Sequence, residues 1–169
     1  MKRILRNISY LLLLLTLFPA LSSCDNEDDV EAIFNGKTWK LSRLTTKGSS
    51  APFYPGIWKN EEEEKKSKDR LREGSCTIVF NSVDVNGEIT GTADANGFSA
   101  RIENATLKID GKERTLSIIG KISGSESDPL AKAFLLGLGK VSSYEGDSNS
   151  LTLYFEDENT TKVIGLSAR

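Results

Sequence analysis

Few residues in this chain could carry out chemistry, and their types exclude most reaction classes. The 169 residues include no histidine, which removes the commonest general base, the commonest zinc ligand and any serine–histidine or cysteine–histidine pair. Paired carboxylates such as Glu103 and Glu113 remain, and a hydrolase would hold them about 5–10 Å apart in a cleft. Solvated acids beside turns are the plainer interpretation. We therefore expect no enzyme, no metal and no cofactor, with a carboxylate-based hydrolase as a remote alternative.

The residues ahead of the first cysteine have the pattern of a secretory leader. Lys2, Arg3 and Arg6 form a positively charged start, and an apolar run from Tyr10 to Phe18 follows. The run is too short for a membrane-spanning helix of about 20 residues but suits the apolar core of a signal peptide. The sequence thus predicts a leader over residues 1–23.

The stretch Leu21-Ser22-Ser23-Cys24 resembles the lipobox of bacterial lipoproteins. The resemblance implies cleavage between Ser23 and Cys24, a diacylglyceryl group on the Cys24 sulfur and a third acyl chain on its new amine. Each buried CH₂ of such chains contributes about 0.8 kcal/mol, so two or three chains anchor a protein stably. The membrane is then a partner through this N-terminal lipid. An ordinary signal peptide followed by a chance cysteine is the alternative.

A short acidic segment follows the cysteine. Residues 25–31 are polar except for one valine, and we expect residues 24–33 to form a solvated tether. Their acidity resembles the export signal that sends lipoproteins of some Gram-negative anaerobes to the outer face of the outer membrane. We therefore expect a lipid anchor in the outer membrane, at the cell surface; a plain spacer on the periplasmic face is the alternative.

Removal of residues 1–23 leaves 146 residues, which suits one domain, predicted here as residues 34–169. The leader holds three of the 22 basic residues and none of the 24 acids, so the mature chain has 19 basic and 24 acidic side chains and a formal charge of −5. This balance excludes a basic surface for nucleic acid. Cys76 stands alone beside a β-rich run, which favours a buried thiol. We expect a monomer whose protein or glycan partner is unknown.

The mature chain opens with a strand and an insertion. Trp39 and Leu41 alternate with polar residues, which predicts a strand with Trp39 in the core. Residues 48–74 then interrupt the pattern, and we expect a flexible insertion there. Asn60 and Glu63 form a capping-box pattern at the start of a short solvated helix.

The middle of the chain is typical of an antiparallel meander. Apolar and β-branched segments at residues 77–85, 88–93, 98–102, 105–109 and 115–122 are separated by Asn86-Gly87, Asn96-Gly97 and Asp110-Gly111. Such pairs accept positive φ at both positions, which predicts type I′ hairpin turns.

One helix and two strands complete the domain. Asp128 suits an N-cap, Pro129 suits the first helical position, and Leu130, Phe134, Leu138 and Val141 make one apolar stripe. Alternation over residues 151–155 and 160–166 predicts the last two strands. The fold class we expect is mainly β (α+β): an antiparallel meander curled into a half-barrel, with one amphipathic helix packed on it as a lid.

This order of elements is similar to the META domain of small secreted proteins and lipoproteins, over about residues 34–166. The matching stretches are Trp39-Lys40-Leu41, Gly91, Asn96-Gly97-Phe98, Glu126 ahead of Phe134-Leu135 and Leu138, and Leu151-Thr152-Leu153-Tyr154-Phe155. The chain lacks the two cysteines common in META domains. It also resembles lipocalin-like lipoproteins, whose Gly-x-Trp compares with Gly36-Lys37-Thr38-Trp39 here, one residue longer. Neither resemblance supplies catalytic residues.

Two functions follow as expectations. The first is a non-catalytic, surface-tethered interaction or stress-related module, with Phe53, Tyr54 and Trp58 as its candidate recognition loop, because aromatic residues dominate binding hot spots. The same three residues could instead fold back to close one end of the sheet. The second function is a lipocalin-like carrier of a small apolar ligand, which requires an interior that its own side chains leave open. We expect the interior to be filled by Trp39, Phe80, Phe98, Phe134 and Phe155.

Overall fold

The computed structural model describes residues 26–84 and 89–169. Ser23 and Cys24 lie outside the described residues, so cleavage and lipidation stay predictions, as does the turn at Asn86-Gly87. No helix in the described part of the chain is long and apolar enough to cross a membrane.

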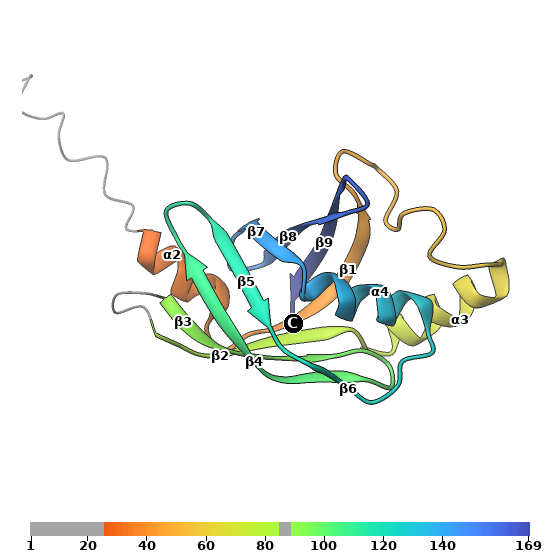
Figure 1. Ribbon diagram of the computed structural model, residues 1–169, viewed down its shortest axis with the longest axis horizontal. Coiled ribbons are helices and arrows are strands. Elements are labelled where there is room, and N and C mark those ends of the chain that lie inside the picture. Colours follow the sequence, from red (N-terminus) through yellow and green to blue (C-terminus); the bar gives the residue numbers. More distant parts are fainter. Residues whose placement is uncertain (1–25, 85–88) are drawn as a thin grey trace, which may run out of the picture.

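Antiparallel strands dominate the fold, and helices cover its ends (Figure 1). The described elements, in chain order, are α2 (Asn26–Phe34), β1 (Thr38–Thr46), α3 (Glu61–Arg72), β2 (Thr77–Asp84), β3 (Ile89–Asn96), β4 (Arg101–Asp110), β5 (Thr115–Ile119), β6 (Ile122–Ser123), α4 (Pro129–Leu138), β7 (Val141–Gly146), β8 (Ser150–Asp157) and β9 (Thr160–Ala168).

The sheet closes on itself. Its strand order is β3-β2-β1-β9-β8-β7-β5-β4-β6, and β3 also pairs with β4, so eight strands form a ring that β6 extends beside β4. The mainly β, antiparallel class with a helix packed on it is therefore confirmed, and the sheet forms a closed barrel rather than a half-barrel. Alternation places one face of each strand inside; in β4, for example, Ile102, Ala105, Leu107 and Ile109 are buried while their neighbours are exposed.

The ring has one thin join, between β5 and β7. Only Thr115 and Ser143 pair across it, supported by a bond from the Tyr144 N–H to the Arg114 carbonyl at 2.9 Å. On the other side of β7, a long ladder runs along β8, and another joins β8 to β9. The outer surface beside this thin join is where a groove forms, as described below.

Large side chains are buried inside the barrel. Trp39, Phe34, Phe80 and Phe134 are fully buried, and Phe155 is 4% exposed. The Phe34 ring stands edge-to-face against Phe80 and Tyr144, with ring centroids 4.9 Å apart in both pairs. Phe98 differs from the expectation because it is only partly buried and lies under Arg70, whose guanidinium is 4.3 Å from its ring centroid.

Helix α2 closes one end of the barrel, which corrects the expected tether over residues 24–33. From Asn26 onward the chain is helical, and Val30, Ile33 and Phe34 are buried in the core. The Trp39 indole N–H donates to the Ile33 carbonyl at 3.2 Å. The segment folds because these three apolar residues, spaced i, i+3 and i+4, share one helical face.

Helix α4 covers the opposite end (Figure 1). Asp128 caps it as predicted, accepting from the N–H groups of Leu130 and Ala131 at 2.9 and 3.2 Å, and Pro129 is the first helical residue. Gly137 fits against the barrel because a Cβ there would lie only 3.0 Å from the Phe155 ring and 3.2 Å from Ile164. The helix ends at Leu138, so Val141 belongs to β7 and not to the helical stripe.

The type I′ turns predicted within the described residues are wrong at both positions. Positive φ is absent from Asn96-Gly97 and from Asp110-Gly111 and occurs instead at Glu158 and Asn159 (51° and 60°), between β8 and β9. The Asp110 carboxylate accepts from the N–H groups of Lys112 and Glu113, both at 2.9 Å, which favours a longer loop over a two-residue turn. The conformation of the β3–β4 loop depends instead on hydrogen bonds to the Glu126 carboxylate.

Candidate functional site

The predicted recognition loop extends the barrel wall. Phe53 forms an isolated parallel bridge with Leu44; the Leu44 N–H donates to the Pro52 carbonyl at 2.8 Å, and the Tyr54 N–H donates to the Leu44 carbonyl at 2.9 Å. These bonds fix the backbone of the loop against the edge of β1.

The three aromatic side chains do not form one surface. Phe53 and Trp58 pack edge-to-face with centroids 5.3 Å apart, and the Lys68 ammonium lies 5.8 and 5.6 Å from their ring centres. Tyr54 faces a different cation, Lys162, whose ammonium is 4.2 Å from its ring centre. All three rings are partly buried against the core. This geometry favours the interpretation in which the loop closes one end of the sheet.

Helix α3 is packed rather than free, which corrects the expected flexible insertion over residues 48–74. The Asn60 side chain accepts from the Glu63 N–H at 2.9 Å as predicted, while the Glu63 carboxylate accepts from the backbone N–H of Lys59. The Trp58 indole N–H donates to the Ser67 hydroxyl, which donates to Asp128, each at 2.8 Å. Ser67 is fully buried. One hydrogen-bonded chain therefore joins the loop, α3 and the cap of α4.

A second carboxylate ties the β3–β4 loop to the start of α4. Glu126 Oε2 accepts from the backbone N–H groups of Phe98, Ser99 and Ala100 at 2.8, 2.8 and 3.2 Å. Its Oε1 accepts from the backbone N–H of Asp128 at 3.1 Å. Partial burial works to raise the pKa of Glu126, but these backbone bonds together outweigh it and hold that pKa below its ordinary value. A Cβ on Gly97 would lie 2.8 Å from Oε2, so glycine lets the loop wrap around the carboxylate.

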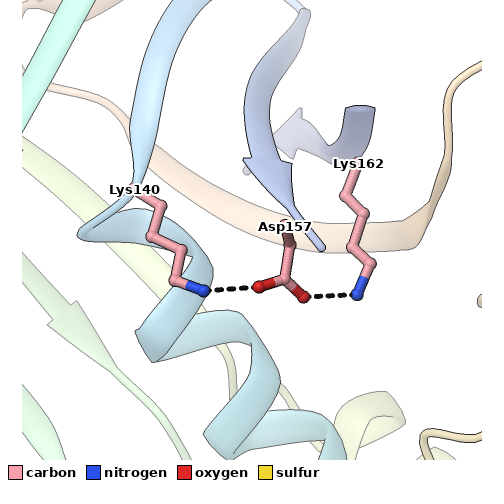
Figure 2. Close-up of polar contacts among 3 residues, drawn as sticks. All are labelled: Lys140, Asp157 and Lys162. Atoms are coloured by element: carbon pink, nitrogen blue, oxygen red, sulfur yellow. Dashed lines mark hydrogen bonds and ion pairs between the residues drawn. The ribbon is translucent and has the colours of Figure 1, made fainter. Parts of the chain in front are cut away.

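A third carboxylate joins the end of α4 to the last hairpin. Asp157 receives bonds from the ammonium groups of Lys140 and Lys162, each at 2.5 Å (Figure 2). These two hydrogen bonds lower the pKa of Asp157 to about 2. The cluster is a structural clamp, since its single carboxylate already engages both lysines.

An open groove of about 470 Å³ lies on the outer surface beside the thin β5–β7 join. It runs between Lys47, Arg114, Glu145 and Tyr154, and we call it the Tyr154 groove. The Tyr154 hydroxyl donates to Glu145 at 2.7 Å, and the Lys47 ammonium is 5.0 Å from the Tyr154 ring centre. Burial, and then the bond to Glu145, raises the pKa of Tyr154, so the phenol stays protonated. Sequence analysis missed this site, although the alternation over residues 151–155 does place Tyr154 on the outer face.

A second groove, of about 420 Å³, lies between α3 and the start of α4. Its lining includes Arg70, Asp69 and Asp128. Arg70 stacks on Phe98, and Asp128 serves the α4 cap and Ser67, so both side chains already have structural partners.

The remaining candidate groups do not form a reaction centre. Glu103 lies near the start of β4, exposed and paired with Arg101 at 2.8 Å, whereas Glu113 follows the end of β4. At about 3.3 Å per residue, the strand separates them by roughly 20 Å or more. Cys76 is fully buried, and burial raises the pKa of its thiol far above the ordinary value. Within the described residues, no group of three metal-ligating side chains comes together.

The sequence of this chain matches a family of domains whose function is not assigned. A sequence model described as "Domain of unknown function (DUF4847)" matches residues 25–168. A crystal structure of a DUF4847 family protein from Bacteroides vulgatus ATCC 8482 is similar at 21% identity and a TM-score of 0.49, covering 82% of this chain and 96% of that one. No curated protein matches. The match to this family gives no support to the META or lipocalin resemblance.

Proposed function

The chain belongs to the DUF4847 family, and from that premise we propose that it is a lipid-anchored, non-catalytic recognition module of the cell envelope. The observation that carries the proposal is the filled barrel. Trp39, Phe34, Phe80 and Phe134 are all fully buried and occupy the interior. An eight-stranded barrel of this kind either fills with side chains or holds one small ligand, and these four buried aromatic residues support the first case. Recognition is then assigned to the outer surface.

A carrier of a small apolar ligand is the second candidate function. The closed eight-stranded ring favours it, because barrels of that size hold small ligands in other proteins. Against it stands Phe34, which reaches from α2 between Phe80 and Tyr144 and takes the space that an apolar ligand would need at that end.

The absence of catalysis is also a proposal. It rests on the chain's lack of histidine and on the distance along β4 between Glu103 and Glu113. The buried Cys76 thiol lacks both the exposure and the lowered pKa that a nucleophilic thiolate needs.

The anchor defines where the module works. We propose that Cys24 carries the lipid in the outer membrane, with the domain at the cell surface rather than on the periplasmic face. Helix α2 begins at Asn26, two residues after Cys24, and three of its residues belong to the core. The lipid would therefore hold the barrel close to the bilayer by its α2 end, without a long spacer.

Metabolic labelling tests the anchor. Cells that express the full chain are grown with a clickable fatty acid; the wild type should be labelled and Cys24→Ser should not. Cys76→Ser is the matched control and should label like the wild type, because that thiol is buried. Equal labelling of wild type and Cys24→Ser would contradict the proposal. Protease treatment of intact cells separates the two membrane faces, since only a surface protein is cut without opening the envelope.

A further inference from the structure

The charges that line the Tyr154 groove indicate which class of ligand it could bind. Three cations, Lys47, Lys112 and Arg114, line it with three acids, Glu113, Glu145 and Glu156. The formal charges of these six side chains cancel. A groove for a polyanion or an acidic ligand would show an excess of cations, so the charge balance favours a neutral ligand.

The size of the groove suits a small ligand rather than a large partner. Its apolar side chains are the aromatic residues Tyr144, Tyr154 and Phe155, and none of its described lining residues is aliphatic. Its volume of about 470 Å³ falls within the range of small-ligand sites.

The Tyr154 groove also contains hydrogen-bonding groups that have no partner among the described residues. Within residues 26–84 and 89–169, the side chains of Lys112, Glu113 and Arg114 have no hydrogen-bond or ion-pair partner. The groove therefore offers both donors and acceptors, together with the Tyr154 ring, whose hydroxyl is held by Glu145. Sugars fit this pattern, because a sugar ring offers a C–H face to an aromatic ring and hydroxyls that both donate and accept.

The backbone at Arg114 adds an independent observation. Arg114 has φ of +52°, in the left-handed region where glycine and asparagine are favoured. Its carbonyl accepts from the Tyr144 N–H across the thin join, so the turn is held in place. Strained backbone positions cluster at functional sites, so the left-handed φ of Arg114, inside the groove lining, supports a role for its side chain.

We propose that the Tyr154 groove binds a neutral oligosaccharide, with one sugar ring stacked on Tyr154 and its hydroxyls bonded to Arg114 and the neighbouring charged side chains. This names the ligand class of the recognition module proposed above, and it rests on that proposed function. Lys47, which lies over the Tyr154 ring, would move aside or contact the edge of the bound sugar.

Binding to an array of defined oligosaccharides tests the proposal. The full mature chain, extracted in detergent, is applied to neutral glucans, xylans and mannans and, in parallel, to sulfated and uronic-acid oligosaccharides. The wild type should bind at least one neutral probe. Tyr154→Ala should weaken that binding at least tenfold, whereas Tyr154→Phe, which keeps the ring, should retain most of it. Failure to bind any neutral probe, binding of acidic probes alone, or unchanged binding by Tyr154→Ala would overturn the proposal.

Arg114→Gly separates binding from folding. Glycine adopts the observed φ without strain, so this variant should keep or raise the melting temperature while its binding falls at least tenfold. Glu158→Gly is the matched control: Glu158 also has a left-handed φ, of +51°, but lies outside the groove lining, so its binding should match the wild type. Equal loss of binding in both glycine variants, or none in Arg114→Gly, would contradict a role for Arg114.

Failure of the oligosaccharide proposal can be told apart from failure of the proposed recognition function. Saturable uptake of a fatty acid into the barrel would overturn that broader proposal in favour of a carrier. The array would still report on the groove, because Tyr154 and Arg114 line the outer surface and do not belong to the buried core.

Discussion

The two ends of the barrel are closed in different ways. At the α2 end, Val30, Ile33 and Phe34 form an apolar plug, supported by the bond from Trp39 to the Ile33 carbonyl. At the α4 end, carboxylates hold the helix in place: Asp128 caps it, Glu126 ties its start to the β3–β4 loop, and Asp157 at the end of β8 binds Lys140, which follows the helix. The stability that apolar burial provides does not depend on pH. The stability that these carboxylates provide is lost when they are protonated. The two ends should therefore respond differently to substitution and to acid.

Truncation of Trp39, which supports the α2 plug from β1, should have the largest effect. Trp39 is fully buried beside α2, and Trp39→Ala should cost about 3–5 kcal/mol, the usual penalty for a large aromatic residue in a core. Urea denaturation of the mature protein measures it. Trp39→Phe is the control and should lose less, because most of the apolar volume remains. A cost under about 1 kcal/mol for Trp39→Ala would show that the α2 end is not sealed as described.

The aromatic loop at the α4 end should come next. Phe53→Ala, Tyr54→Ala and Trp58→Ala combined should lower the melting temperature by several degrees, because all three rings pack on the core and Trp58 donates to Ser67. Calorimetry measures the shift. A triple variant that melts like the wild type would instead revive the interpretation of this loop as a recognition surface.

Loss of the α4 cap should be smaller. Asp128→Ala removes the N-cap acceptor, a loss of about 0.5–2 kcal/mol, and leaves the buried Ser67 hydroxyl without its acceptor. Asp128→Asn keeps an oxygen for the cap and should be milder. Both free energies of unfolding can be measured by urea denaturation. If Asp128→Ala and Asp128→Asn prove equally stable, the cap contributes nothing and the polar account of this end fails.

Acid should weaken the α4 end selectively. The folded-state pKa of Asp157 is about 2 and that of Glu126 is also lowered, so both carboxylates bind protons more readily in the unfolded chain. Their contribution is therefore full above the ordinary carboxyl pKa near 4 and is lost as the pH falls toward 2. The melting temperature of wild type should drop over that window more than that of Asp157→Asn. Parallel curves for the two proteins would exclude the Asp157 clamp as a source of acid sensitivity.

The contrast between the two ends of the barrel also shows which features could be predicted from the sequence. Asp128, Pro129 and the capping pattern at Asn60 are local signals, and the structure confirms each of them. The α2 plug was missed because its acidic residues concealed an apolar spacing at Val30, Ile33 and Phe34 that is helical. That spacing could have predicted the helix, but not its place in the barrel, which depends on contacts with Phe80 and Tyr144.

Contacts distant in sequence account for the other differences. Gly97 predicted a hairpin turn, but the loop follows the Glu126 carboxylate, 29 residues further along the chain. Closure of the barrel depends on β3 pairing with β4 and on the thin join at Thr115 and Ser143, which no local pattern indicates. The Tyr154 groove combines separate strands and a turn, so it becomes visible only after the barrel is closed.

The central claim is that the barrel is filled and recognition takes place outside it. Titration of the mature protein with a fluorescent long-chain fatty acid tests this claim most directly. The wild type should show no saturable binding, because Phe34 already occupies the space beside Phe80 and Tyr144. Tight one-to-one binding by the wild type would contradict the claim and identify the protein as a carrier.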